Sequence, residues 1–435
     1  MSIKFNQKFR CIVSIITLLF ISLAGSYVYK QSTSQQLAQQ KTALKENSAF
    51  AANTTLAATF ENPAVVPETS NQAINKPNIV ISRKPPASVP VTYPVIDEWK
   101  KYKFSINGNK IFTPVKLPKS QVNFNQTDLL TVLINTRKYF QDHASEDPDI
   151  FRKGILGTQG VSIPDMLKTL DFMITTLNED IANKRTTRLQ DPNFINANFR
   201  VIKWSAHNPQ NKKQQRLRIT KYAVFTHPGS RTKTSTFNTP IYSLKENSNT
   251  DTFYTRYTKQ DVLSGIYEPG GKEFGKVKPL AYLTRNGLEE ALMQGTVLIN
   301  FTDGSKAFFN VDKNNGISYV RGLKATTQKR YWYFRQVDAI KGYGHTIDAK
   351  ISIKPGVTFA GDVLNIGLGK VIVIEHTKNG RKHLQMGVIA DTGGAFLPNL
   401  YQLDFLAGIF RSQKDFKQHI QQLPEYANAY VLVKK

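Results

Sequence analysis

The pattern of apolar and polar positions divides the chain into a helical part and a later part rich in strands. Apolar residues recur at intervals of three and four over residues 127–140 and again over 163–177, which predicts two amphipathic helices. Thr127 or Asp128 is the expected N-cap of the first helix. Ser162 is the expected N-cap of the second, with Pro164 and Asp165 in its first turn.

After residue 198 the pattern changes to short β-type runs separated by Gly, Asn and Thr. Strands are predicted at 218–225, 297–301, 307–311, 331–335 and 370–376. Later helices are expected only at 286–293 and 412–422. Many short strands with turn signals indicate a barrel or a sandwich. The sequence therefore predicts an α+β protein in which β structure dominates.

The N-terminal region has the pattern of an export segment followed by a tether. Residues 11–29 carry no charge and follow Lys4, Lys8 and Arg10, so residues 1–29 are predicted to be a signal peptide or an uncleaved transmembrane signal anchor. The sequence leaves both alternatives open. Residues 30–96 are rich in Gln, Ser, Thr, Ala, Asn and Pro and are predicted to be a disordered linker.

Charge and cysteine content narrow the possible functions. The formal net charge of +26 predicts attraction to polyanions such as nucleic acid, anionic lipid or acidic cell-wall polymers, without choosing among them. Cys11 is the single cysteine, which excludes an intramolecular disulfide and a cysteine metal site. The seven histidines show no His-x-x-x-His spacing, so no metal site and no cofactor are predicted.

One stretch carries the candidate chemistry. Alternating apolar residues predict a strand that runs into Asp391, and Gly393 and Gly394 then allow a tight turn or a close approach to a ligand. Asp404 lies between two apolar residues, where burial can raise the pKa of a carboxyl into the range useful for proton transfer. On pattern alone, a simple turn and a solvent-facing strand carboxylate remain alternatives.

Over residues 125–435 the chain carries an ordered series of short motifs that resembles the family of membrane-bound lytic murein transglycosylase A (MltA). The last part, with Asp391-Thr-Gly-Gly-Ala395 followed by Asp404, is the most specific. The other motifs are Asn198-Phe-Arg-Val201, Gly229-Ser-Arg-Thr232 with Pro240-Ile-Tyr242, Gln294-Gly-Thr296 with Asp303-Gly304, Lys313-Asn-Asn-Gly316, Tyr331-Trp-Tyr-Phe-Arg335, and Asp348 with Ile353-Lys-Pro-Gly356.

The resemblance implies a double-psi β-barrel domain with an inserted second β-barrel domain and a few N-terminal helices. In this chain, residues 97–217 would form the N-terminal helical part of the barrel domain. Residues 218–330 would form the inserted β domain. Residues 331–435 would form the C-terminal, three-aspartate part of the double-psi barrel.

The resemblance also implies an activity. The implied activity is that of a peptidoglycan lytic exotransglycosylase, which is a lyase. Such an enzyme cleaves the β-1,4 bond between N-acetylmuramic acid and N-acetylglucosamine, and the C6 hydroxyl of the muramic acid closes a 1,6-anhydro ring. The sequence itself does not decide between endo and exo cleavage. The implied location is the periplasm of a Gram-negative cell envelope. The implied partners are glycan strands and other cell-wall enzymes. No nucleic acid is implied as a partner. The membrane is a further partner if the N-terminal segment is uncleaved.

The implied site has one catalytic carboxyl, Asp404, acting first as general acid and then as general base. Asp391 and Asp348 are the implied supporting carboxylates. The candidate substrate-binding residues are Gln294, Gly295, Tyr242, Gly393 and Gly394. For Gln294 and Tyr242, a structural role is as well supported as a binding role.

Several residues depart from the family pattern. Lys221 and Ala223 replace a Gly and a Tyr of the family, Val297 replaces a Gly, and 310–312 read Asn-Val-Asp in place of Tyr-Ala-Gly. These changes are predicted to lie in saccharide-contacting loops. They favour an alternative function, a catalytically impaired peptidoglycan-binding scaffold. A nucleic-acid-binding membrane protein is supported by charge alone.

Overall fold

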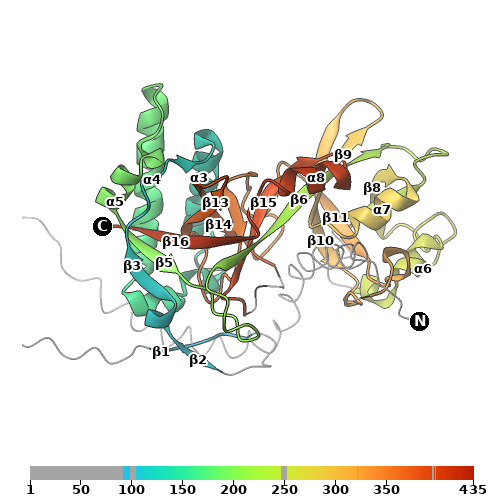
Figure 1. The fold of residues 1–435 in the computed structure, drawn as a ribbon. Helices are drawn as coiled ribbons and strands as arrows, with labels where there is room; N and C mark the ends of the chain where they lie inside the picture. Colours follow the sequence, from blue (N-terminus) through green and yellow to red (C-terminus); the bar gives the residue numbers. More distant parts are fainter. Residues whose placement is uncertain (1–91, 98–103, 246–251, 321, 394–395, 397) are drawn as a thin grey trace, which may run out of the picture. The chain divides into compact units, whose positions relative to one another are not determined.

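The computed structural model describes residues 92–97, 104–245, 252–320, 322–393, 396 and 398–435 (Figure 1). The predicted signal or anchor segment and most of the predicted linker lie outside these residues. The last linker residues are described, and they are folded: β1 (Thr92–Pro94) pairs with β2 (Ser105–Asn107), and Val95 is buried. The folded part therefore begins before the predicted boundary at residue 97.

All described residues belong to one unit that contains residues 91–435, and a second unit, 28–90, lies outside them. In the described ranges, no helix combines the length and the apolar character that crossing a membrane requires.

The two predicted N-terminal helices are confirmed as α3 (Gln126–Asp142) and α4 (Ile163–Ala182), and a short α5 (Pro192–Asn198) follows. Ser162 and Asp165 form a reciprocal capping box at the start of α4, as the sequence predicts. The cap of α3 differs from the prediction. It is Asn125, whose side chain accepts a hydrogen bond from the backbone N–H of Asp128 at 3.0 Å.

Six strands form a closed hydrogen-bonded circuit, in the order β6-β15-β12-β14-β13-β16 and back to β6. The pairs β6–β15 and β12–β14 are parallel, and the other pairs are antiparallel. The strands are β6 (Leu217–Gly229), β12 (Thr358–Ala360), β13 (Val371–Lys378), β14 (Arg381–Asp391), β15 (Gln402–Phe410) and β16 (Tyr426–Lys434). A closed circuit of strands is a barrel, and we refer to these strands as the ring.

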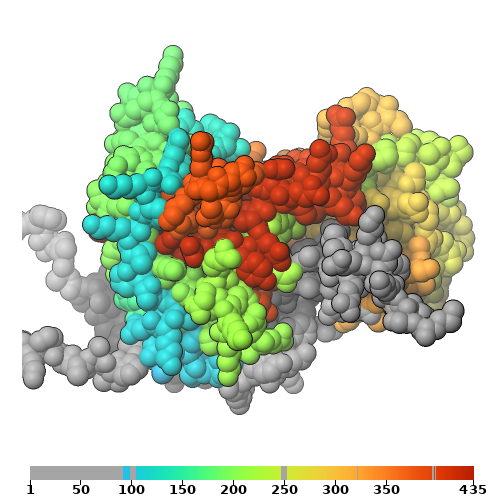
Figure 2. All heavy atoms as spheres, in the orientation of Figure 1, coloured from blue at the N-terminus to red at the C-terminus, as the bar shows by residue number. Residues whose placement is uncertain are grey.

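Shorter strands and a helix extend the ring. β5 (Phe199–Trp204) pairs with β16, β3 (Phe112–Val115) pairs with β5, and β4 (Val122–Asn123) pairs with β14. α8 (Gln413–Ile420) lies between β15 and β16 in the chain. The C-terminal residues, coloured red, form a continuous band on the face seen in Figure 2.

The long strand β6 connects the ring to a second set of strands. Its last residues pair in parallel with β9 (Thr296–Phe301), which continues into β10 (Lys306–Asn314) and β11 (Trp332–Val337). β7 (Thr239–Leu244) and β8 (Val277–Leu283) form a separate pair. The short helices α6 (Lys259–Leu263) and α7 (Arg285–Ala291) complete this part. The predicted β-dominant α+β class is confirmed.

Two large hydrophobic clusters form the cores of the ring and of the second set of strands. The first joins apolar faces of α3 and α4 to the interior of the ring. The second lies within residues 241–334 and is rich in aromatic side chains, including Tyr242, Tyr267 and Tyr333. The predicted domain boundaries themselves stay a prediction.

Candidate active site

Two carboxylates meet on either side of strand β12. Ala360 of β12 pairs with Asp391 of β14 on one edge and with Asp404 of β15 on the other. Neighbouring strands lie about 4.8 Å apart, so the two aspartates occupy the same level of the ring, about 10 Å apart at the backbone. The fold thus brings together two residues that are separated by a glycine-containing turn in the sequence.

Asp404 is almost fully buried, with 3% of its surface exposed. Its Oδ1 has no hydrogen-bond partner within the described part of the chain. Burial is the main reason that the pKa of Asp404 is raised to about 7; the negative charge of Asp391 adds to this, and Arg218 and Lys221 act in the opposite direction. This carboxyl therefore holds a proton close to neutral pH.

Asp391 is held by two hydrogen bonds. Its Oδ2 accepts from the hydroxyl of Tyr222 at 2.7 Å, and its Oδ1 accepts from the backbone N–H of Thr392 at 2.8 Å. Burial raises the pKa of Asp391 to about 6, and these bonds together with Lys350 limit the increase. The pKa of Asp391 is lower than that of Asp404, so Asp391 ionises first and its charge keeps the proton on Asp404.

Asp348, the third predicted aspartate, does not join this pair. Its side chain is 76% exposed, and both of its oxygens accept hydrogen bonds from Nη1 of Arg335 at 2.7 Å. Nη2 of Arg335 also donates to Asp312 at 3.2 Å. Asp348 is therefore part of a surface ion pair, and a supporting role for it stays a prediction.

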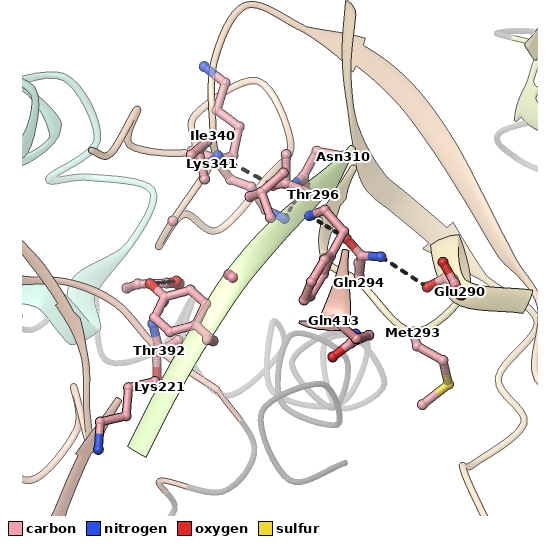
Figure 3. Close-up of a pocket in the computed structure, with 18 of the residues that line it drawn as sticks. Lys221, Glu290, Met293, Gln294, Thr296, Asn310, Ile340, Lys341, Thr392 and Gln413 are labelled. Atoms are coloured by element: carbon pink, nitrogen blue, oxygen red, sulfur yellow. Dashed lines mark hydrogen bonds between the residues drawn. The ribbon is translucent and has the colours of Figure 1, made fainter. Parts of the chain in front are cut away.

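A cavity of about 370 Å³ lies beside the carboxylate pair. Strand β6 runs along it, and Lys221 and Gln294 lie on different sides of that strand (Figure 3). The ring supplies Lys221, Tyr222, Asp391 and Thr392 to its lining. Asp404 is not a lining residue. Asp391 is thus the acid of the pair that faces the cavity directly.

The opposite wall comes from residues next to β9 and β10. The Oε1 of Gln294 accepts from the backbone N–H of Phe225 at 3.0 Å, and its Nε2 lies 2.9 Å from Nε2 of His227. Burial lowers the pKa of His227 to about 4, so this imidazole is neutral and accepts the bond from the amide. The Gln294 side chain lines the cavity, but its amide is engaged within the protein.

Gly295 also lines the cavity, and no atom lies within 4 Å of the position that a Cβ would take. Tyr242 is placed differently. It is buried in the core of the segment that the chain inserts between the ring strands β6 and β12, which we call the inserted part, and its ring meets that of Tyr267 edge-on with centroids 5.3 Å apart. The geometry therefore assigns Tyr242 to the core and Gly295 to the cavity wall.

Of the two glycines after Asp391, the structure describes only Gly393. Gly393 is buried, and its carbonyl accepts a hydrogen bond from the backbone N–H of Phe396 at 3.0 Å. Gly393 does not line the cavity. Gly394 lies outside the described residues.

The departures from the family pattern have two different locations. Lys221, Ala223 and Asn310 line the cavity, but they lie on strands β6 and β10 and not in loops, and contact with a saccharide stays a prediction. Val297 does not line the cavity. It is fully buried in the aromatic-rich cluster, so the prediction that it lies in a saccharide-contacting loop is wrong. A β-branched side chain on a strand is readily explained by this core environment.

Lys221 and Lys350, two of the three lysines that line the cavity, were not among the predicted site residues. The ammonium of Lys350 donates to Oδ1 of Asn310 at 2.6 Å, and that of Lys221 donates to the carbonyl of Pro424. Burial lowers the pKa of each lysine to about 8. A single lysine carries no sequence motif, so only the fold reveals that these positions face the same cavity.

No family model matches the sequence, and no curated protein matches it either. Solved structures do match. The membrane-bound lytic murein transglycosylase from Agrobacterium tumefaciens aligns with a TM-score of 0.50 and 15% sequence identity, over 74% of this chain and 98% of that chain. MltA from Neisseria gonorrhoeae gives 0.49 and 14%, over 74% and 91%. E. coli MltA with bound chitohexaose gives 0.48 and 16%, over 74% and 94%.

The likeness to the Agrobacterium structure shows the fold. It spans almost the whole of that chain, and it confirms the fold that the motif series implies.

Proposed function

We propose that this chain, which has the fold of a membrane-bound lytic murein transglycosylase, is a peptidoglycan lytic transglycosylase. It would cleave the β-1,4 bond between N-acetylmuramic acid and N-acetylglucosamine and leave a 1,6-anhydromuramic acid. The observation that carries the proposal is the pair of half-buried Asp391 and buried Asp404, with raised pKa values, beside a cavity.

A single carboxyl can perform both proton transfers of this reaction. Protonated Asp404 donates its proton to the glycosidic oxygen as the bond to C1 breaks, and the N-acetylglucosamine leaves with a hydroxyl group. The Asp404 carboxylate then accepts the proton of the C6 hydroxyl as that oxygen bonds to C1. Most glycosidases need a second carboxylate as nucleophile or to activate water. Here the nucleophile is held within the substrate itself.

Asp391 has the complementary role in this proposal. Its ionised carboxylate faces the cavity, and the hydrogen bond from Tyr222 fixes its position. A fixed negative charge there stabilises the positive charge that develops on the sugar ring as the bond to C1 breaks. It also raises the pKa of Asp404, which keeps the general acid protonated.

The burial of Asp404 sets a condition on this assignment. Because Asp404 does not line the cavity, substrate binding must bring the glycosidic oxygen within hydrogen-bond reach of it. The other assignment, in which Asp391 donates the proton, predicts that replacing Asp391 abolishes turnover and that replacing Asp404 only reduces it.

The charge of the whole chain supports an anionic substrate. The net charge is +26, whereas the cavity lining itself holds three lysines, Lys221, Lys341 and Lys350, and three acids, Glu289, Glu290 and Asp391. Stem peptides and lactyl groups make peptidoglycan anionic, so a strongly basic chain attracts it. Binding to isolated sacculi should weaken as salt is added.

The second candidate is a peptidoglycan-binding scaffold of the same fold that has lost turnover. The observation that favours it is the near-complete burial of Asp404 away from the cavity lining. The departures Lys221 and Ala223, which both line the cavity, point in the same direction.

Product analysis separates these candidates. The full-length chain, purified in detergent, is incubated with isolated sacculi, and the released muropeptides are identified by mass spectrometry. Anhydro-muropeptides, lighter by one water than hydrolysis products, support the transglycosylase. Sacculi that are bound but uncut support the scaffold, and reducing-end products indicate a hydrolase. An Asp348→Asn variant is the comparison, because Asp348 is exposed and outside the pair; full activity in this variant would argue against the supporting role predicted for Asp348.

The proposal places the folded part in the periplasm, with residues 1–29 as a signal peptide or an anchor. Glycan strands are the substrate, and other cell-wall enzymes are proposed partners. Fractionation of cells, followed by sequencing of the mature N-terminus, distinguishes a cleaved signal from an anchor.

A further inference from the structure

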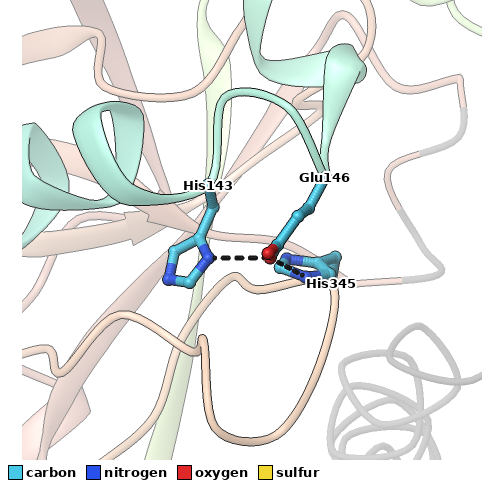
Figure 4. A group of neighbouring side chains, drawn as sticks. All are labelled: His143, Glu146 and His345. Atoms are coloured by element: carbon cyan, nitrogen blue, oxygen red, sulfur yellow. Dashed lines mark hydrogen bonds and ion pairs between the residues drawn. The ribbon is translucent and has the colours of Figure 1, made fainter.

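Three side chains with metal-ligating atoms converge at the end of α3. His143 directly follows that helix, Glu146 lies three residues later, and His345 comes from the segment between β11 and β12 (Figure 4). We propose that His143, Glu146 and His345 form a binding site for a divalent cation of the zinc type. No part of this site belongs to the Asp391–Asp404 pair.

The distances between the ligand atoms fit such a cation. Nδ1 of His143 and Nε2 of His345 lie 3.1 and 3.0 Å from the same oxygen, Oε2 of Glu146. All the ligand atoms lie within 4.8 Å of one another. Zinc binds nitrogen and oxygen ligands at about 2.0–2.2 Å, which places tetrahedral ligands about 3.3–3.5 Å apart. Small side-chain movements are enough to reach this geometry.

A buried hydrogen-bond chain orients His345 toward the site. The hydroxyl of Tyr139 donates to Oδ2 of Asp147 at 2.7 Å, so its oxygen is the acceptor for Nδ1 of His345 at 3.1 Å. Asp147 is fully buried. This arrangement, in which a second partner fixes the tautomer of the imidazole, is the usual support of a metal-binding histidine.

The same chain creates an electrostatic need for a cation. With the proton on Nδ1, a neutral His345 turns the lone pair of Nε2 toward the carboxylate of Glu146. Two electron-rich atoms 3.0 Å apart repel each other unless a positive charge lies with them. His143 is also the C-cap of α3, where the unpaired helix carbonyls favour a cation.

The exposure of the three side chains leaves room for a cation to enter. The side chains of His143, Glu146 and His345 are 25%, 56% and 14% exposed. Three protein ligands and a solvent-facing fourth position, filled by water, are a coordination that zinc commonly adopts. The alternative occupant is a proton on His345, which would make the cluster a simple ion pair.

A bound cation would tie α3 to the wall of the cavity. The segment that carries His345 also supplies Lys341, Gly342 and Lys350 to the cavity lining. Within it, the backbone N–H of Tyr343 donates to the carbonyl of Ala390, next to Asp391. The inferred site is therefore structural, and it is tested by metal binding without any assay of activity.

The test uses the full-length chain in detergent, without a histidine tag and stripped of metal with a chelator. Titration with zinc chloride in a calorimeter should show one site per chain, and cobalt(II) should give the visible absorption of a four-coordinate ion. His345→Ala and Glu146→Gln should each weaken binding by about 100-fold or more. Tyr139→Phe should weaken it by about tenfold, as expected for loss of an outer partner.

His383→Ala is the matched control, because His383 stacks on His376 with ring centroids 5.4 Å apart and is not one of the three residues of the cluster. Its affinity for zinc should equal that of the unaltered chain. Glu146 is exposed, so Glu146→Gln should keep the fold, which circular dichroism checks. The proposal is overturned if the unaltered chain binds no zinc, which would leave an ion pair only, or if His383→Ala abolishes binding and Glu146→Gln does not.

Discussion

The two walls of the cavity use their polar groups in opposite ways. On the ring side, half-buried Asp391 lines the cavity and buried Asp404 lies behind the lining; both have raised pKa values, and Oδ1 of Asp404 has no hydrogen-bond partner in the described residues. On the inserted side, the amide of Gln294 and the side chain of Asn310 are engaged in internal hydrogen bonds. One wall is suited to exchanging protons and the other to keeping a fixed shape.

The difference follows from how each wall is built. Strand β12 brings a carboxylate from each neighbouring strand into a low-dielectric interior, where an ionised acid is costly. On the inserted side, the amide of Gln294 stands just before β9 and bonds to Phe225 and His227 of β6. These hydrogen bonds hold β6 beside β9. The two aspartates with raised pKa values therefore belong to the ring, and replacing residues on the two walls should change different properties.

The largest expected effect is on the ring side. Asp404→Asn should lower the rate of anhydro-muropeptide release by about 10³-fold or more, because proton transfer by a positioned acid contributes 10²–10⁴-fold and the same group acts twice here. Binding to sacculi should be unchanged, as measured by co-sedimentation. Asp348→Asn, the exposed counterpart, should keep nearly full activity. Equal losses in the two variants would remove the distinction between buried and exposed acids.

The second largest effect is expected at Asp391, the neighbour of Asp404. Asp391→Asn should reduce turnover at pH 7 by about 10²-fold, because it removes a fixed charge beside the reacting sugar. It should also lower the pKa of Asp404, whose proton the charge of Asp391 helps to retain. The fall in activity with rising pH should therefore begin at lower pH than in the unaltered protein. A pH–rate profile that keeps its alkaline limb in place would contradict this coupling.

Stability should respond to pH through Asp404. Its pKa is raised from 3.8 in the unfolded chain to about 7, so the folded state binds this proton more tightly. The stabilisation is complete below pH 3.8 and is lost as pH rises through about 7. Asparagine does not ionise, so Asp404→Asn should gain about 2–4 kcal/mol relative to the unaltered protein between pH 4 and pH 8. Thermal unfolding at both pH values measures this, and a gap that stays constant with pH would count against it.

Smaller effects are expected on the inserted side. Gln294→Ala should cost about 1–3 kcal/mol of stability, because it leaves the buried N–H of Phe225 without its acceptor. Denaturant unfolding measures this loss, which should show no dependence on the protonation of Asp404.

The smallest effect should come from the neighbouring residue. Gly295→Ala should leave stability within about 0.5 kcal/mol, since the added Cβ meets no atom within 4 Å. The methyl group projects at the cavity wall, so binding of glycan fragments should weaken by a few-fold, measured by calorimetry. A large loss of stability here, with binding unchanged, would assign Gly295 to the core.

Much of the fold could be predicted from periodicity and turn signals. The stripe and N-cap of α4 and the strands β6, β9, β10, β11 and β13 lie where helical spacing and alternation place them, whereas β7, β8 and β12 were not predicted. The N-cap of α3 was missed by two or three residues, because Asn, Thr and Asp are all good caps and stand close together at 125–128. The folding of 92–96 was missed because its pairing partner, β2, lies about ten residues away and carries little periodic signal.

The site was also only partly predictable, because it depends on pairings between residues that are distant in the sequence. Asp391 and Asp404 share a recognisable motif, whereas the closure of the ring that buries them depends on pairings across the whole chain. Tyr242 carried a family-like motif but lies in the core. The cluster of His143 and Glu146 with His345 has no compact spacing, since about 200 residues separate its two halves, and the search for paired histidines therefore missed it.

The central claim is that the carboxyl at position 404 carries a proton near neutral pH beside an ionised Asp391. Infrared difference spectra between the unaltered chain and Asp404→Asn, recorded from pH 4 to pH 9, measure this directly through the C=O band of the protonated carboxyl. The band should persist to about pH 7 and should disappear at lower pH when Asp391 is replaced by asparagine. A carboxyl that is already ionised at pH 5 would contradict the account.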